Sequence, residues 1–251
     1  MKNQNANSSS PALDAATLTQ AFAALKTYDW GSDRKTLGPI DDAVTATRGD
    51  ATACKNLETR LAAVLDSGVS RAAKDFACRT LTVIGSAASV PALSALLGDA
   101  ELSHMARYAL ERVPAPEAAA ALRDALPKLN GKLKIGAIGS LGVRRDEASV
   151  PALSALIACS DFAVATAATN ALGDIGCEAA AKVLCDATKT APTAVKPAAA
   201  DAALAAAKRL LADGNTTAAM ATYNALLAGN PPKYIRLAAS RGTLWVASKK
   251  S

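Results

Sequence analysis

The octapeptide SVPALSAL stands at residues 89–96 and again at residues 149–156. The copies begin at Ser89 and Ser149, and the recurrence of a segment along a chain is the signature of a repeat architecture. In each copy a serine comes first, and a proline follows two positions later, as in the first turn of a helix. We therefore expect each copy to begin a helix in a repeated unit.

Two series of leucines divide the distance between the copies into two units of nearly equal length. Both series advance in steps of 29, 31 and 31. A shared step means that each unit carries two helices in a fixed relation, which is a stacked αα-hairpin. The first helices carry Leu93, Leu122, Leu153 and Leu184. The second helices carry Leu81, Leu110, Leu141 and Leu172.

Composition and helix-end residues agree with an all-α fold. About a quarter of the chain is alanine and only 4% is aromatic, which favours many thin helix-to-helix contacts over one large aromatic core. Ser89 and Ser149 stand at predicted N-caps, and Gly85, Gly142 and Gly176 at or just past the ends of second helices, where a left-handed residue is favoured. No run of alternating β-branched residues predicts a strand.

The predicted architecture is a right-handed α-α superhelix of about six helical pairs. Residues 1–10 are expected to form a disordered tail, and residues 11–251 a single helical-repeat domain. Within it we expect an N-terminal cap pair in 11–55, four regular repeats in 56–177 and two less regular pairs in 178–251. Trp30 and Trp245, near opposite ends, are expected to plug the exposed ends of the core. Alternatively, Tyr223, Tyr234 and Trp245 form a ligand patch.

The segment from Val164 to Gly176, VATAATNALGDIG, resembles the second helix of a HEAT repeat of the phycobilisome-lyase-like group. The usual arginine of that pattern is replaced by Ala165 here and by Ser103 in an earlier unit. The phrases LSHMARYALE (102–111) and LGVRRD (141–146) are also similar to HEAT-repeat proteins of planctomycete-type bacteria. The resemblance implies an armadillo-like α-solenoid and a bacterial origin, and it implies no activity, because HEAT folds host scaffolds and enzymes alike.

The candidate site is a polar stripe across three neighbouring repeats. On the helix from Ser103 to Arg112, the residues His104, Arg107, Tyr108 and Glu111 share one face. In a HEAT hairpin the second helix usually lines the concave side, so this face is expected in a groove. The alternative is an ordinary solvated face with ion pairs within and between repeats. The predicted binding residues are Arg79, His104, Arg107, Tyr108, Arg144 and Arg145.

No catalytic, metal or cofactor site is predicted. His104 is the single histidine, and the five cysteines include no CxxC pair. A Cys78–His104 dyad would need a lowered thiol pKa, so a buried structural Cys78 is the preferred interpretation. Gly136, Gly139 and Gly142 lie inside a predicted helix with no preceding strand, which indicates close helix packing and not a phosphate loop.

The predicted function is a non-catalytic scaffold, monomeric on its own, that binds a partner protein or peptide in its concave groove. The alternative is a nucleic-acid-binding HEAT protein with a basic groove, although a net charge of +6 is modest for one. A lyase-type enzyme is a more distant alternative. With no signal-like start and no apolar run of about 20 residues, we expect a cytoplasmic protein without a membrane span. A secreted or periplasmic protein whose signal peptide is missing would look the same.

Overall fold

The computed structural model describes residues 14–229 and 231–248. The expected tail at residues 1–10 lies outside these ranges. In the described ranges the regular structure is entirely helical. The α-helices are α1 (Ala15–Thr27), α2 (Gly38–Ala46), α3 (Ala51–Leu65), α4 (Arg71–Ile84), α5 (Val90–Ala95), α6 (Ser103–Arg112), α7 (Pro116–Ala125), α8 (Gly131–Val143), α9 (Val150–Leu156), α10 (Phe162–Ile175), α11 (Glu178–Thr190), α12 (Lys196–Ala212), α13 (Thr216–Ala228) and α14 (Lys233–Ser248). Short 3₁₀ helices are η1 (Arg34–Leu37), η2 (Ala87–Ser89), η3 (Leu126–Lys128) and η4 (Glu147–Ser149).

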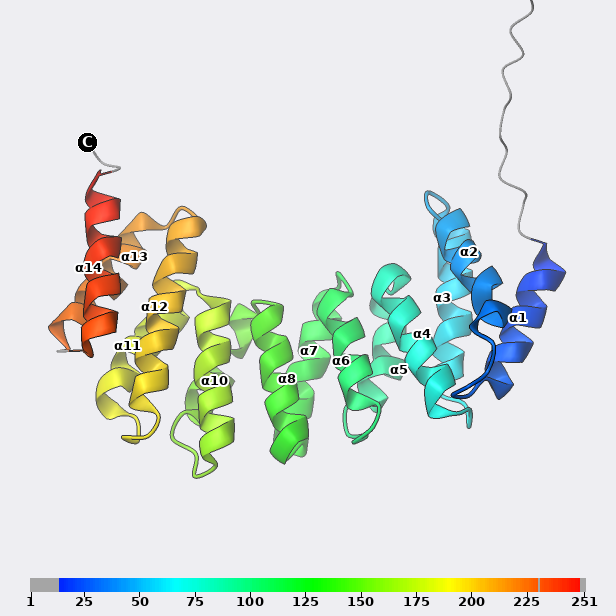
Figure 1. Ribbon diagram of the computed structural model, residues 1–251, viewed down its shortest axis with the longest axis horizontal. Coiled ribbons are helices and arrows are strands. Elements are labelled where there is room, and N and C mark those ends of the chain that lie inside the picture. Colours follow the sequence, from blue (N-terminus) through cyan, green and yellow to red (C-terminus); the bar gives the residue numbers. More distant parts are fainter. Residues whose placement is uncertain (1–13, 230, 249–251) are drawn as a thin grey trace, which may run out of the picture.

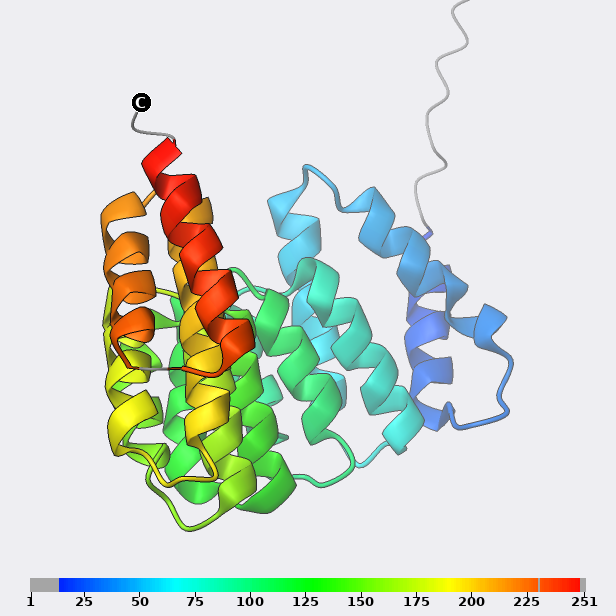
Figure 2. The ribbon, with the colours of Figure 1, turned by 60° about the vertical axis from the view of Figure 1, so that its left-hand side comes forward.

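Consecutive helices form antiparallel pairs, and the pairs stack in two layers. The described residues hold seven pairs, where about six were expected. The second helices α4, α6, α8, α10 and α12 pack on one another in series, and they form the front layer in Figure 1. The stack is curved, and the two views place the second helices on its inner, concave side (Figures 1 and 2). The molecule is therefore a HEAT-like helical solenoid.

The two leucine series form the middle of the core. All eight side chains are completely buried, so the predicted repeat register is confirmed. Neighbouring second helices approach each other closely because small residues lie where they touch. A Cβ added at Gly142 on α8 would lie 3.0 Å from the Cα of Ala171 on α10, and one at Gly173 would lie 3.0 Å from the Cα of Ala202 on α12. Alanine and glycine thus set the spacing of the later repeats.

The helix ends differ in detail from the predicted caps. Gly176 has the left-handed backbone expected after a helix, but Gly85 is extended and Gly142 lies inside α8. Arg145 has the left-handed conformation instead, with φ 53°. This is uncommon for a non-glycine residue. The left-handed backbone predicted for Gly85 and Gly142 was therefore wrong, because both glycines serve close packing at the helix ends: a Cβ at Gly85 would lie 2.5 Å from the Leu81 carbonyl oxygen.

The loops before the two octapeptides are held by different side chains. Ser86 precedes the first copy, and its backbone N–H and hydroxyl both donate to the buried carboxylate of Glu58 on α3, the N–H at 2.6 Å. Asp146 precedes the second copy, and it accepts two 2.6 Å hydrogen bonds from Arg123 on α7. In both cases the preceding first helix supplies the partner.

The tryptophans do not close the ends of the core as predicted. Trp30 lies in the turn after α1, and Trp245 lies on α14; both side chains are exposed. The prediction was wrong because smaller residues already fill the terminal pairs. Leu25, Leu37 and Ile40 are buried at one end of the solenoid, and Ile235 and Val246 at the other.

Candidate binding surface on the concave face

The exposed side of α6 carries two of the predicted groove residues, His104 and Tyr108, and a third residue, Arg112. His104 and Tyr108 are exposed, one turn apart. The Arg112 guanidinium lies over the Tyr108 ring, 3.8 Å from its centroid, which restrains both side chains. Tyr108 and Arg112 are the residue types that most often dominate interface energies.

Arg107 turns away from the groove and joins α6 to α8. A Cβ added at Gly136 would lie 2.4 Å from the Arg107 Cζ, so a larger residue there would displace this guanidinium. Arg107 donates to the Ser140 hydroxyl at 3.5 Å, and Ser140 donates to Glu111 at 2.7 Å. Burial lowers the pKa of Arg107, and the Glu111 carboxylate opposes that shift. Close packing at Gly136 is therefore explained by Arg107, whereas Gly139 is open to solvent.

Arg144 and Arg145 also connect neighbouring repeats. The Arg144 guanidinium donates to the carbonyls of Val113 (2.9 Å) and Ala115 (3.0 Å), just beyond the end of α6. A cation is favoured at the C-terminus of a helix, because the last carbonyls of the helix have no hydrogen-bond partner within it. Arg145 donates to the carbonyl of Ile175 at the end of α10 and pairs with Asp213 after α12.

The six predicted residues therefore fall into two groups. Arg79, His104 and Tyr108 are exposed on the concave layer, with Arg79 paired to Asp75 one turn earlier at 3.0 Å. Arg107, Arg144 and Arg145 are partly buried and hold repeats together. A binding role for any of the six stays a prediction.

Two further sets of exposed positions follow from the repeat register. In the four regular repeats, the residue two positions before the buried leucine of each second helix is exposed. The residue two positions after that leucine is exposed as well. The first set is Arg79, Tyr108, Gly139 and Asn170. The second set, here called the valine row, is Val83, Arg112, Val143 and Asp174.

The valine row was missed by the sequence analysis. Val83 is 66% exposed and Val143 is 62% exposed, although both are β-branched and apolar. The sequence could have predicted their exposure, because each valine lies two residues after a buried leucine of the repeat register. Two residues are about half a turn, so the valine lies on the side of the helix opposite the core. Apolar residues at that offset belong to the groove and not to the core.

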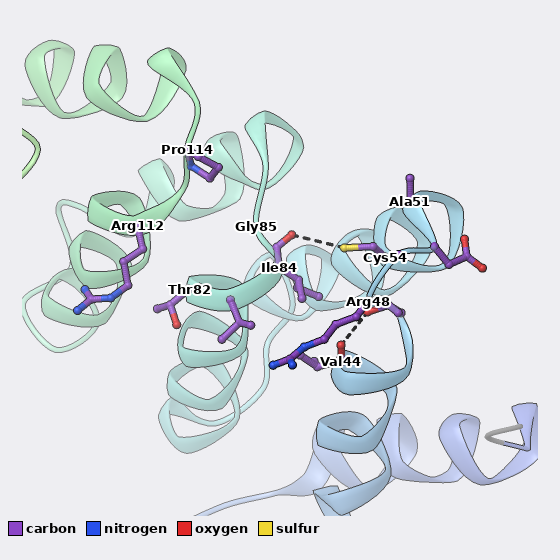
Figure 3. Close-up of a pocket in the computed structure, with 13 residues that line it drawn as sticks. Val44, Arg48, Ala51, Cys54, Thr82, Ile84, Gly85, Arg112 and Pro114 are labelled. Carbon is purple, nitrogen blue, oxygen red and sulfur yellow. Dashed lines mark hydrogen bonds between the residues drawn. The ribbon is translucent and has the colours of Figure 1, made fainter. Parts of the chain in front are cut away.

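A pocket of about 570 Å³ adjoins the first valine of this row. It lies between the end of α2, the start of α3 and the ends of α4 and α6 (Figure 3). Val44, Ile84 and Pro114 give it apolar walls, and Arg48 and Arg112 give it positive charge (Figure 3). Its lining carboxylate, Asp50, accepts the N–H of Ala53 as the N-cap of α3. The pocket suits an apolar group next to an acidic one.

Cys78 and the acidic residues of the described ranges bear on two kinds of site, an activated thiol and a metal-binding cluster. Cys78 is fully buried, and burial together with the nearby Asp75 raises the pKa of its thiol to about 12. That shift is opposite to the one that activates a nucleophilic thiol. Within residues 14–229 and 231–248, no three His, Cys, Asp or Glu side chains gather as they would around a metal ion.

Residues 126–205 match the family model for HEAT repeats. This part of the chain carries HEAT repeats. The matched range includes α8 to α11, the first part of α12 and the segment Val164 to Gly176, on which the resemblance was based. No curated protein matches the sequence. In the described part of the chain, no helix combines the length and apolar character that crossing a membrane requires.

Two solved structures show a distant likeness over nearly the whole length of the chain. Human deoxyhypusine hydroxylase in complex with glycerol is 18% identical, with 93% of this chain and 98% of that chain covered and a TM-score of 0.36. An engineered protein is 21% identical, with 91% and 96% covered and a TM-score of 0.29. At such TM-scores neither likeness bears on function.

Proposed function

We propose that this protein is a non-catalytic HEAT-repeat scaffold that binds an extended segment of a partner protein across α4, α6 and α8. The observation that carries the proposal is the exposure of Val83, Tyr108 and Val143 on three neighbouring second helices. Exposed apolar side chains that gather on one surface mark interaction sites. Rigid helices hold them at fixed spacing, which keeps the entropy lost on binding small.

The spacing of the row suits an extended chain. Packed helices lie about 8–10 Å apart, and an extended chain rises about 3.3 Å per residue. A bound segment would therefore place about every third residue over a new helix. The valine row alternates apolar and charged side chains, with Arg112 between Val83 and Val143. We infer a ligand with apolar residues over the two valines and an acidic residue over Arg112.

Nucleic acid is the less favoured ligand because the groove lacks a free row of cations in the described repeats. Arg107, Arg144 and Arg145 contact neighbouring helices, and Arg79 pairs with Asp75. A phosphate backbone requires several unpaired Lys or Arg side chains along its path. An enzymatic role has less support still, because burial holds the Cys78 thiol protonated.

A random peptide display library selected on the whole chain tests the proposal. We expect enriched peptides to carry an acidic residue about three positions from an apolar one. Their affinity should fall at least about tenfold for the double variant Val83→Ser, Val143→Ser, since two exposed apolar contacts are lost. The matched control is Phe162→Ser, because Phe162 is 55% exposed but lies at the start of α10, outside the row.

Two outcomes would contradict the proposal. Peptides that bind the double variant as tightly as the unaltered chain would place the site elsewhere. Single-stranded nucleic acid that binds the groove with a steep salt dependence, and that Val83→Ser does not weaken, would favour the alternative.

A further inference from the structure

Helix α14 has apolar side chains on two opposite faces. In the described ranges nine large hydrophobic side chains are exposed, and four of them belong to this one helix. They are Tyr234, Leu237, Leu244 and Trp245, with exposures between 48% and 70%. Scattered exposed hydrophobics are ordinary, but a concentration on one helix requires an explanation.

The other face of α14 already holds the helix in place. Ile235, Ala239 and Val246 are buried, and α14 packs against α13 and α12. Gly242 leaves room for the Tyr223 ring of α13, since a Cβ there would lie 2.4 Å from the Tyr223 Cζ. The buried face of α14 is thus distinct from the side that carries the exposed residues.

The exposed residues lie together along the length of the helix. Tyr234, Leu237, Arg241, Leu244 and Trp245 follow steps of three, four, three and one residues, which keeps them on one side of an α-helix. We call these five residues the α14 stripe. The helix stands at the end of the stack opposite α1, so the stripe lies apart from the groove of α4, α6 and α8 (Figure 1).

The charged residues around the stripe are mostly basic. From residue 214 to residue 251 the sequence holds five basic residues and no acidic one. Lys233, Arg236 and Arg241 are exposed on α14. One carboxylate from a packed element faces the helix, that of Asp201 on α12, and it is hydrogen-bonded to the Tyr234 side chain. The occupant of this surface is therefore expected to be anionic.

We propose that the α14 stripe binds the surface of an anionic lipid bilayer. Leucine, tryptophan and tyrosine beside Lys and Arg form the pattern of a helix that lies in the membrane interface, with its apolar side in the headgroup boundary. Long cationic side chains can reach anionic headgroups while their methylene stems stay among apolar groups. A second copy of this chain is a poorer occupant, because two stripes would bring like charges together.

Tryptophan fluorescence of the whole chain gives a direct test. Trp30 and Trp245 are the two tryptophans, so Trp30→Phe makes the emission report on α14 alone. We expect the emission to move to shorter wavelength with vesicles of phosphatidylcholine and phosphatidylglycerol, and to stay unchanged with phosphatidylcholine alone. Added salt should reverse the shift, since each cation strengthens binding to an anionic surface about fivefold at low salt.

Variants in the same background separate the stripe from the rest of the surface. Leu237→Ser with Leu244→Ser should weaken vesicle binding at least about tenfold and leave the melting temperature almost unchanged, because both side chains are exposed. Arg236→Gln with Arg241→Gln should weaken it by a similar factor. Phe162→Ser should have no effect.

Three results would overturn the proposal. The first is no spectral shift with the anionic vesicles. The second is vesicle binding that the two leucine substitutions do not change. The third is self-association in sedimentation experiments without lipid, abolished by those substitutions, which would make a second copy the occupant.

Discussion

The two copies of SVPALSAL have identical sequences, yet opposite charges hold them. At the first copy a buried carboxylate, Glu58, binds the loop through Ser86 and the N–H of Ser89. At the second, a guanidinium, Arg123, binds the loop through Asp146. Ser86 and Asp146 occupy equivalent places before their copies. In both copies the loop is therefore attached to the preceding first helix at the same loop position. The charge of the attaching side chain on that helix can be negative or positive, provided that the loop residue changes with it.

Within the octapeptides the first serine and the first leucine are held alike. Leu93 and Leu153 are both completely buried. Ser89 and Ser149 are completely buried as well, and each donates its hydroxyl to the carbonyl three residues earlier. Neither serine forms the side-chain N-cap predicted for it, because the preceding 3₁₀ turn places its hydroxyl toward that carbonyl. Elsewhere the copies differ in burial: Ala92 and Leu96 are buried in the first copy, whereas Ala152 is exposed and Leu156 is half-buried in the second.

The largest effect is expected from the shared leucines. Leu93→Ala and Leu153→Ala should each lower the free energy of unfolding by about 2–5 kcal/mol, because each leaves a cavity in a core with few large side chains. Urea denaturation followed by circular dichroism measures both. Losses that differ by more than about 1.5 kcal/mol would show that the copies are not equivalent in packing.

The next largest effect should come from the first loop. Glu58→Ala removes the acceptor for two backbone N–H groups at a carboxylate that is 3% exposed, and should cost about 3 kcal/mol. Glu58→Gln keeps the shape and one acceptor oxygen, so it should cost less. Equal losses for the two variants would mean that the negative charge itself holds the loop.

At the second loop the effect should be smaller. Arg123→Ala removes a pair whose two side chains are 30% and 11% exposed, so solvent screens it, and we expect a loss of about 1–2 kcal/mol. The double variant Arg123→Ala, Asp146→Ser gives this loop the residue of the first copy and shows whether Asp146 alone is harmful. A loss as large as that of Glu58→Ala would contradict the ranking by burial.

The smallest effect is expected for the two serines. Ser89→Ala and Ser149→Ala each remove one buried hydrogen bond to a carbonyl, and each should cost about 1 kcal/mol. Thermal melting of the two variants side by side gives the comparison. A clear loss in one copy alone would mean that the differently charged loops change how the shared serines are held.

The sequence predicts the fold well because the buried leucines repeat in a fixed register. It predicts the surface less well, since a helix exposes more than one face. Helical spacing places Arg107, Arg144 and Arg145 in the groove, but their long side chains reach neighbouring helices and donate hydrogen bonds to a hydroxyl and to carbonyls there. Val83 and Val143 were overlooked because exposed valines resemble core residues in one dimension. Val83 and Val143 can be recognised as equivalent surface positions only after the buried leucine of each second helix has been identified.

One contact changes how the solenoid comes apart. Arg145 follows α8 and Asp213 follows α12, so their pair spans 68 positions and passes over the whole of α10. A stack in which each unit touches only its neighbours unzips one unit at a time. This pair couples units that are not neighbours, so a chain pulled from its C-terminal end should meet extra resistance when α12 leaves, and the resistance should be small because solvent screens two side chains that are 39% and 45% exposed. The Arg145 hydrogen bond lowers the pKa of Asp213, so the coupling persists at neutral pH and is lost only as the pH falls through that lowered value.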